Sequence, residues 1–276
     1  MKILITGANG QLGRELVKQL HGTDFLATDV VEMDITNQSA TFKVVKSYQP
    51  DIVIHGAAYT NVDSAESRVD QAYQINAIGT QNIAAACLKY NSKMVYVSTD
   101  YIFDGTLGRP YTEFDQPNPL SVYGKSKLAG EMLSKHILNK LFIIRTSWLF
   151  GDGNNFVRTM LRLGNECSEL RVVNDQFGCP TNVKCLVEAI LKIISTESYG
   201  TYHVVNSGIT TWYEFACKIF EFSGNKRIKV LPQTTKELNR PAPRPPYAPL
   251  DTRMLELTVG LTMKPWEDAL LEYLTV

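Results

Sequence analysis

Paired cysteines and clustered histidines are missing from this sequence. The five cysteines, at positions 87, 167, 179, 185 and 217, are odd in number and scattered, with no C-x-x-C pair. The four histidines, at positions 21, 55, 136 and 203, include no closely spaced pair. Disulfide frameworks and zinc sites need such groupings. We therefore expect neither, and we assign no histidine to chemistry.

An excess of charge of either sign is also missing. Lys plus Arg number 28 and Asp plus Glu number 28, so the formal net charge is zero. Non-specific binding to nucleic acid depends on a basic excess, so we expect neither nucleic acid nor an anionic membrane as a partner. No apolar run approaches the roughly 18 residues of a membrane span or resembles a signal peptide. We expect a cytoplasmic protein.

What the sequence does contain is enough apolar material for a large core. It has 276 residues, of which 44% are hydrophobic and 20% charged, which is typical of one large or two closely packed globular domains. Up to residue 145, short β-rich runs alternate with longer helical patterns, which indicates βαβ units and a doubly wound parallel sheet of the α/β class. We expect strands near 2–6, 24–28, 52–55, 94–98 and 142–145, and helices over 11–20, 39–48, 69–90 and 124–136.

After Arg145 this alternation weakens, although the pattern still predicts a helix over 154–163, a strand over 201–206 and an amphipathic helix over 212–222. We expect a Rossmann-like dinucleotide-binding domain of residues 1–146 plus part of 180–206. A smaller, interleaved α+β lobe of residues 147–179 and 207–276 would bind the substrate.

Residues 240–249 hold five of the twelve prolines, a composition that excludes helix and central strand. Such a segment is typical of a linker or of a PxxP ligand for another protein. Only 27 residues follow Pro249, too few for a further domain. We therefore favour a fixed strap within the C-terminal lobe.

A glycine-rich turn joins the first expected strand to the first expected helix. It reads Gly7-Ala-Asn-Gly10-Gln-Leu-Gly13. Gly7 allows a tight turn, Gly10 lets the backbone approach a pyrophosphate, and Gly13 permits close helix packing. Glycine triplets also occur in plain turns, but the flanking strand and helix favour a dinucleotide site.

Acidic and small residues follow the next two strands. Asp29 ends the second strand, 16 residues beyond Gly13, near where a carboxylate would hold the adenine ribose; a solvated loop acid is the alternative. Asp34 could approach the adenine from the next loop. Residues 56–59, Gly-Ala-Ala-Tyr, supply small side chains beside a flat cofactor or form a simple turn.

A second motif, Tyr123-Gly-Lys-Ser-Lys127, places a phenol and an ammonium one helical turn apart. A neighbouring cation favours the phenolate and brings the pKa of the tyrosine towards neutrality, which suits proton transfer. Isolated Y-x-x-x-K pairs are common on helix surfaces. Here Val97-Ser98-Thr99-Asp100, at the end of the fourth strand, adds a hydroxyl that could bond a substrate carbonyl.

With these motifs in place, the chain resembles the extended short-chain dehydrogenases/reductases, and within them the dTDP-4-dehydrorhamnose reductase family. The resemblance spans almost the whole chain. Its more specific motifs lie in the second half: Arg145-Thr-Ser-Trp148, Asp175-Gln-x-Gly178-x-Pro-Thr181, Trp212-Tyr-Glu-Phe-Ala216 and Ala242-Pro-Arg-Pro-Pro-Tyr247. Sugar-nucleotide epimerases would share the glycine turn and Y-x-x-x-K, but not these later blocks.

The resemblance implies roles for individual residues. Tyr123 would donate a proton, Lys127 would lower its pKa and hold the nicotinamide ribose, and Thr99 would tune Tyr123 and touch the sugar. The cofactor, NADH or NADPH, would lie against Tyr123 and Lys127. It would also contact the residues that the family uses for it: Gly7, Gly10, Gln11, Leu12, Gly13, Asp29, Asp34, Ile35, Ala57, Ala58 and Tyr59.

Substrate contacts are implied as well. Thr99 and Asp100 would border the sugar and Trp148 would lie against it, unless that indole is only a core aromatic. Arg244 could clamp the nucleotide diphosphate or remain solvated. Some family members bridge a dimer through magnesium, but Asn182-Val-Lys-Cys185 offers no acid for this, so we expect no metal.

The implied activity is reduction of the C4 ketone of dTDP-4-dehydro-L-rhamnose to dTDP-L-rhamnose, the last step of dTDP-rhamnose synthesis, by a monomer or homodimer. Two alternatives stay open. One is a sugar-nucleotide epimerase or dehydratase on the same scaffold. The other is a non-catalytic regulatory subunit, which the intact Tyr123, Lys127 and Thr99 disfavour.

Overall fold

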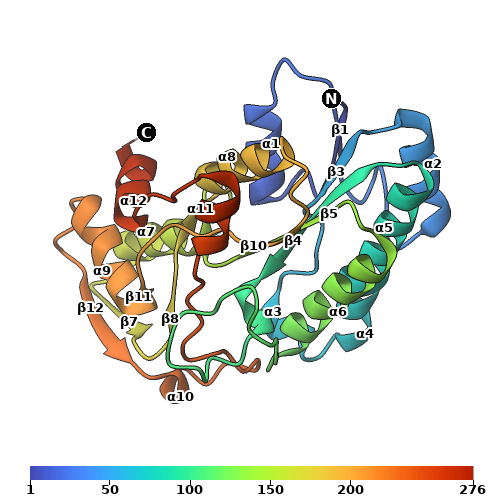
Figure 1. Cartoon of the computed structure of the whole chain (residues 1–276). Coiled ribbons are helices and arrows are strands. Elements are labelled where there is room, and N and C mark those ends of the chain that lie inside the picture. Colours follow the sequence, from blue (N-terminus) through green and yellow to red (C-terminus); the bar gives the residue numbers. More distant parts are fainter. Residues whose placement is uncertain (276) are drawn as a thin grey trace.

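The computed structural model describes residues 1–275, and its centre is a six-stranded parallel sheet in the order β10-β5-β4-β3-β1-β2 (Figure 1). Strand order reverses between β1 and β3, as in doubly wound folds. The predicted α/β class is confirmed. The strands are β1 (Ile3–Thr6), β2 (Phe25–Thr28), β3 (Ile52–His55), β4 (Lys93–Thr99), β5 (Leu141–Thr146) and β10 (Gly200–His203).

Alternate residues of each central strand enter two different cores. In β1, Ile3 and Ile5 join one hydrophobic cluster and Leu4 joins the other. Every residue of β1, β3 and β5 is buried, as expected of a parallel sheet covered on both faces.

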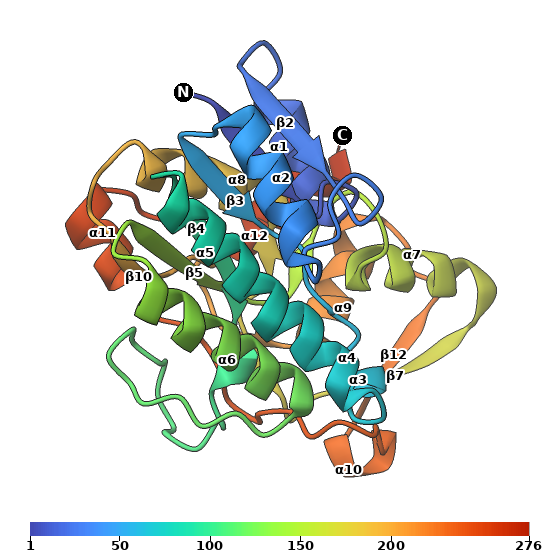
Figure 2. The same ribbon diagram turned by 90° about the vertical axis from the view of Figure 1, so that its right-hand side faces the viewer.

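Helices cover the two faces of this sheet. The helices α2 (Gln38–Tyr48), α5 (Thr80–Lys89) and α6 (Val122–Ile137) pack side by side on one face (Figure 2). On the other face, α1 (Gln11–Gln19) packs against α8 (Val183–Ile194). The sequence analysis did not predict α8.

The helix expected over 69–90 is present over residues 69–89, but a π-helical turn divides it into three contiguous pieces. These are α4 (Val69–Tyr73), the wider π-helical turn η1 (Gln74–Gly79) and α5. In η1, the Asn76 side chain bonds the backbone N–H and C=O of Tyr59. Gly79 lies so close to Ile35 that an added Cβ would sit 2.7 Å from its Cδ1. These polar bonds and this close packing accompany a local widening of the helix, not its end.

The C-terminal half builds a lobe beside the sheet, seen on the left of Figure 1. The strand expected over 201–206 is shorter in the structure and, as β10, pairs with β5. The elements of the lobe are β6 (Leu149–Phe150), α7 (Phe156–Glu166), β7 (Glu169–Val173), β8 (Phe177–Gly178), β9 (Thr181–Asn182), β11 (Thr210–Thr211), α9 (Trp212–Phe222), β12 (Lys229–Gln233), α10 (Thr235–Leu238), α11 (Arg253–Val259) and α12 (Trp266–Thr275).

The proline-rich strap, residues 240–249, is held in place by its backbone. Phe177 N–H donates to Pro246 O (2.8 Å) and Tyr111 N–H donates to Pro249 O (2.8 Å). The predicted fixed strap is therefore confirmed. Within residues 1–275, no helix combines the length and the apolar character that crossing a bilayer requires.

Candidate active site

Two adjoining cavities open at the carboxyl ends of the central strands. The first, of about 500 Å³, is bordered by Gly7, Gly10, Asp29, Asp34, Ile35, Ala57 and Ala58, among others. The second, of about 450 Å³, is bordered by Gln11, Leu12, Gly13, Thr99, Asp100, Tyr123, Lys127 and Trp148, among others. Both share Gly7 and Gly10. The fold thus joins the glycine turn and the Tyr123 motif in one elongated site.

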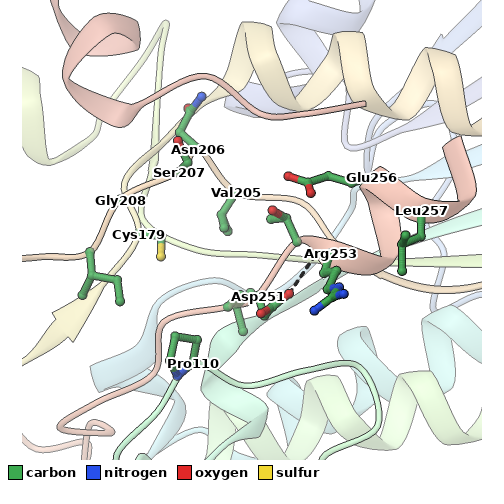
Figure 3. Close-up of a pocket in the computed structure, with 13 residues that line it drawn as sticks. Pro110, Cys179, Val205, Asn206, Ser207, Gly208, Asp251, Arg253, Glu256 and Leu257 are labelled. Atoms are coloured by element: carbon green, nitrogen blue, oxygen red, sulfur yellow. Dashed lines mark hydrogen bonds between the residues drawn. The ribbon is translucent and has the colours of Figure 1, made fainter. Parts of the chain in front are cut away.

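A larger cavity, of about 640 Å³, lies elsewhere, between residues 205–209 and the start of α11 (Figure 3). Its lining includes Cys179, Asp251, Arg253 and Glu256. None of the residues predicted from the sequence borders it, so the predicted chemistry gathers in the two strand-end cavities.

The glycine turn has the geometry that its sequence requires. Gly7 has a φ of +71°, a conformation that favours glycine. An added Cβ at Gly13 would lie 2.3 Å from Gly7 O, so α1 begins in direct contact with the turn. Gly10 precedes the first residue of α1 and borders both cavities. The amino end of α1 therefore faces the site, an arrangement suited to a pyrophosphate.

Asp29 and Asp34 both border the first cavity. Asp29 accepts hydrogen bonds from the N–H of Asn9 (2.9 Å) and Val30 (2.8 Å), so it joins the end of β2 to the glycine turn. Asp34 accepts from Thr36 N–H and Oγ1. Tyr59 differs from the expectation, because its hydroxyl lies 2.8 Å from Ser64 Oγ in α3 (Val62–Ala65). The cavity lining uses its neighbours Ala58 and Thr60 instead.

Tyr123 and Lys127 project from the first turns of α6, which Ser121 caps by accepting from Gly124 N–H. Lys127 Nζ donates to Val97 O (2.7 Å) and lies 4.2 Å from the centre of the Tyr96 ring. Burial lowers the pKa of Lys127 to about 7, and the nearby Glu131 carboxylate opposes this shift. The ammonium is therefore fixed beneath the cavity by a backbone carbonyl.

The environment of Tyr123 differs from the one expected. Desolvation raises the pKa of its phenol above the ordinary value of 10, and the hydrogen bond from Thr99 acts in the opposite direction. The sequence analysis expected the Lys127 cation to dominate. With desolvation prevailing, Tyr123 stays protonated at neutral pH, which suits a proton donor.

Thr99 lies beside Tyr123 and bonds Asp100. Its hydroxyl donates to Asp100 Oδ1 (2.9 Å), and the Asp100 side chain is buried. Burial raises the pKa of Asp100 to about 7, and the Thr99 bond limits this rise. The end of β4 therefore presents a hydroxyl and a carboxyl to the cavity.

An aromatic platform closes the other side. Trp148 has a φ of +47°, and its indole stacks on Trp212 with ring centroids 3.6 Å apart. Both rings border a smaller adjoining cavity with Asp100, Tyr101, Gln176 and Arg244. A non-glycine residue in this backbone region is unusual and marks functional positions.

Arg244 is neither solvated nor free. Its side chain is 16% exposed, and Nη1 and Nη2 donate to the two carboxylate oxygens of Asp63 at 3.0 and 3.1 Å. The solvated alternative is wrong. Sequence reasoning did not single out Asp63, Tyr101 or Asn76.

Buried polar atoms without partners show what kind of ligand fits. Among the described residues, Gln11 Oε1, Ser98 Oγ and Thr146 Oγ1 are buried and lack a hydrogen-bond partner. All three residues border the second cavity. Unpaired buried polar atoms are costly, so the cavity fits a ligand with several polar groups. A dinucleotide meets this requirement.

The fold and the Tyr123, Lys127 and Thr99 arrangement define an extended short-chain dehydrogenase/reductase. Residues 1–276 match the family described as "RmlD substrate binding domain". The chain belongs to this family, and the resemblance to dTDP-4-dehydrorhamnose reductases is confirmed.

Three relatives illustrate the match. A spore coat polysaccharide biosynthesis protein, SpsK of Bacillus subtilis, is 45% identical over 99% of this chain and 96% of its own. The dTDP-4-dehydrorhamnose reductase of Aggregatibacter actinomycetemcomitans is 42% identical over 98% and 97%. The crystal structure of dTDP-4-dehydrorhamnose reductase from Bacillus anthracis, in complex with NADP, is 48% identical over 99% and 98%, with a TM-score of 0.97.

Proposed function

We propose that this chain is an NAD(P)H-dependent reductase that converts dTDP-4-dehydro-L-rhamnose to dTDP-L-rhamnose. The observation that carries the proposal is the meeting of Tyr123, Lys127 and Thr99 in a cavity that continues into the glycine turn. A ketone accepts hydride slowly until its oxygen is stabilised. The site supplies a protonated phenol and a hydroxyl for that task.

The cofactor would lie along both cavities. Gly7, Gly10 and the amino end of α1 would hold the pyrophosphate, Asp29 the adenine ribose, and Lys127 the nicotinamide ribose. When bound, NADPH or NADH supplies the hydride. Asp34, Ile35, Ala57 and Ala58 would border the adenine half, with Gln11, Leu12 and Gly13 beside the turn.

The protein's own groups manage the proton and the sugar. Tyr123, kept protonated by desolvation, donates its proton to the C4 oxygen as charge develops there. Thr99 would bond Tyr123 and touch the same oxygen, while Asp100 would accept a hydrogen bond from a sugar hydroxyl. Trp148 and Arg244 would border the dTDP-sugar.

We assign dinucleotide binding to residues 1–146 with part of 180–206, and substrate binding to 147–179 and 207–276. Pairing of β10 with β5 supports this division. We also place the enzyme in the cytoplasm, where thiols stay reduced, since Cys87, Cys167, Cys179, Cys185 and Cys217 are all free. Oligomeric state, monomer or homodimer, stays a prediction.

The test is absorbance of reduced nicotinamide when dTDP-4-dehydrorhamnose is added to enzyme and NADPH. We expect one NADPH oxidised per sugar nucleotide consumed. Product formed at constant absorbance would indicate an epimerase instead, and absence of turnover would favour the regulatory-subunit alternative.

A further inference from the structure

The strap is held at its two halves by different means. Its second half is fixed by backbone hydrogen bonds: Ala248 N–H donates to Phe177 O (3.1 Å), and Phe177 N–H donates to Pro246 O (2.8 Å). In the first half, the N–H of Ala242 donates to Asp63 Oδ1 (3.2 Å). One carboxylate of the dinucleotide-binding half thus anchors the part of the strap that carries Arg244.

Asp63 gathers several donors from this short segment. Arg244 reaches it with both terminal nitrogens, and Arg240 adds a longer contact of 3.3 Å. The Arg244 side chain is 16% exposed and that of Asp63 is 22% exposed, whereas Arg240 is 56% exposed. Two-pronged pairing of this kind fixes orientation as well as position.

The bonding also limits what Arg244 can offer a ligand. Nη1 donates to Asp63 and to Ala242 O (2.9 Å), which uses both of its hydrogens, and Nη2 uses one on Asp63. A guanidinium has five N–H donors, so two remain. Arg244 can therefore meet an anion while keeping its bond to Asp63.

Asp63 lies between the second cavity and the smaller cavity that adjoins it. Thr60 and Val62, directly before it, border the second cavity. Arg244 and Tyr101 border the adjoining smaller cavity, and Tyr101 packs edge-on against Tyr123 with centroids 5.6 Å apart. A shift of the first half of the strap would move one wall of the cavity next to the proton donor.

We infer that Asp63 is a positioning residue for the sugar nucleotide: its carboxylate anchors the first half of the strap and holds Arg244 against the substrate cavity. Asp63 acts through Arg244 and takes no part in the proton transfer. The inference rests on the proposed function for its substrate, but the anchoring itself is independent of that function.

The central variant is Asp63→Asn, which keeps the size of the side chain and removes its charge. We expect KM for the sugar nucleotide to rise about tenfold, as for loss of a charged hydrogen-bonded pair, with kcat within about threefold and NADPH affinity unchanged. Asp63→Glu, which keeps the charge, should restore most of the affinity. Asp70→Asn, an exposed acid in the next helix, is the matched control and should resemble wild type.

Two further measurements separate anchoring from general damage. Amide hydrogen exchange should become faster at Ala242 and stay unchanged at Ala248 in Asp63→Asn, because only the first half of the strap loses its anchor. Arg244→Gln should raise KM similarly, and combining it with Asp63→Asn should add little, since the two residues act as a unit.

The inference is overturned if Ala242 exchanges as in wild type, if the two substitutions add fully, or if NADPH affinity falls as much as sugar-nucleotide affinity. Should Asp63→Asn fail to fold, Asp63→Ser, which also removes the carboxylate, gives the same exchange readout. Wild-type protein that turns over no dTDP-4-dehydrorhamnose would contradict the proposed function, while the exchange result would still decide the anchoring.

Discussion

The indole rings of Trp148 and Trp212 stack with their centroids 3.6 Å apart and their planes 9° from parallel. Trp148 lies two residues beyond the end of β5 and Trp212 begins α9, so both belong to the substrate-binding lobe. Gly178 completes the arrangement, because an added Cβ there would lie 2.5 Å from the Trp148 ring. The platform is therefore built within the lobe, and both rings border the second cavity.

Replacing Trp212 by Leu should weaken sugar-nucleotide binding by roughly tenfold, since Trp148 loses the ring that fixes it. NADPH affinity should stay unchanged. Titration calorimetry with dTDP measures the first effect and nicotinamide fluorescence the second. Tyr213→Leu, the next residue of α9, serves as the control; equal losses in both variants would mean that only the stability of α9 had changed.

Tyr123→Phe keeps the packing of the ring and removes the acid. We expect turnover to fall by about 10²- to 10⁴-fold, the usual contribution of a positioned proton donor, with NADPH affinity within about twofold. Single-turnover absorbance measurements test this. If turnover stays within a few-fold of wild type, another group delivers the proton.

Asp100→Asn should change how stability depends on pH. The pKa of Asp100 is raised from 3.8 to about 7 in the folded protein, so its ionisation opposes folding increasingly as pH rises through this window. The variant should be more stable than wild type at pH 8, by at most ~4 kcal/mol, with a smaller difference at pH 5. Urea unfolding at both pH values tests this, and a difference independent of pH would refute it.

Asp29 should set the cofactor preference. Its carboxylate, at the end of β2 beside Asn9, accepts bonds from a ribose 2′-OH but repels a 2′-phosphate. We expect NADH to be used at least as well as NADPH at low salt, with the gap narrowing as salt screens the repulsion. Asp29→Ala should shift kcat/KM towards NADPH. A wild-type preference for NADPH that this substitution leaves intact would mean that Asp29 does not face the ribose.

The first half of the fold was predictable because local signals agree there. Apolar strands such as Ile52–His55, the Gly7 turn and the amphipathic α1 each indicate the same βαβ order. The π-helical turn around Asn76 was not predictable, since it depends on bonds to Tyr59, 17 residues away along the chain. The lobe was predicted less well, because pairs such as β7 and β12 bring together strands some 60 residues apart.

In the site, too, features set by local sequence were predictable and features set by distant contacts were not. Residues that carry their own motif, such as Tyr123, Lys127 and the glycines, were identified from spacing and resemblance. The partners that orient them were not: Asp63 and Arg244 lie 181 residues apart. Spacing also could not show that desolvation raises the pKa of Tyr123, because burial is a property of the whole fold.

The central claim is that this chain delivers a hydride to C4 of the sugar nucleotide, and isotope transfer tests it most directly. NADPH or NADH carrying deuterium at the transferable position is incubated with dTDP-4-dehydrorhamnose and the enzyme, and the product is examined by NMR. We predict dTDP-rhamnose with one deuterium at C4 and stoichiometric oxidation of the cofactor. A converted sugar without deuterium, or with the cofactor still reduced, would contradict the reductase account.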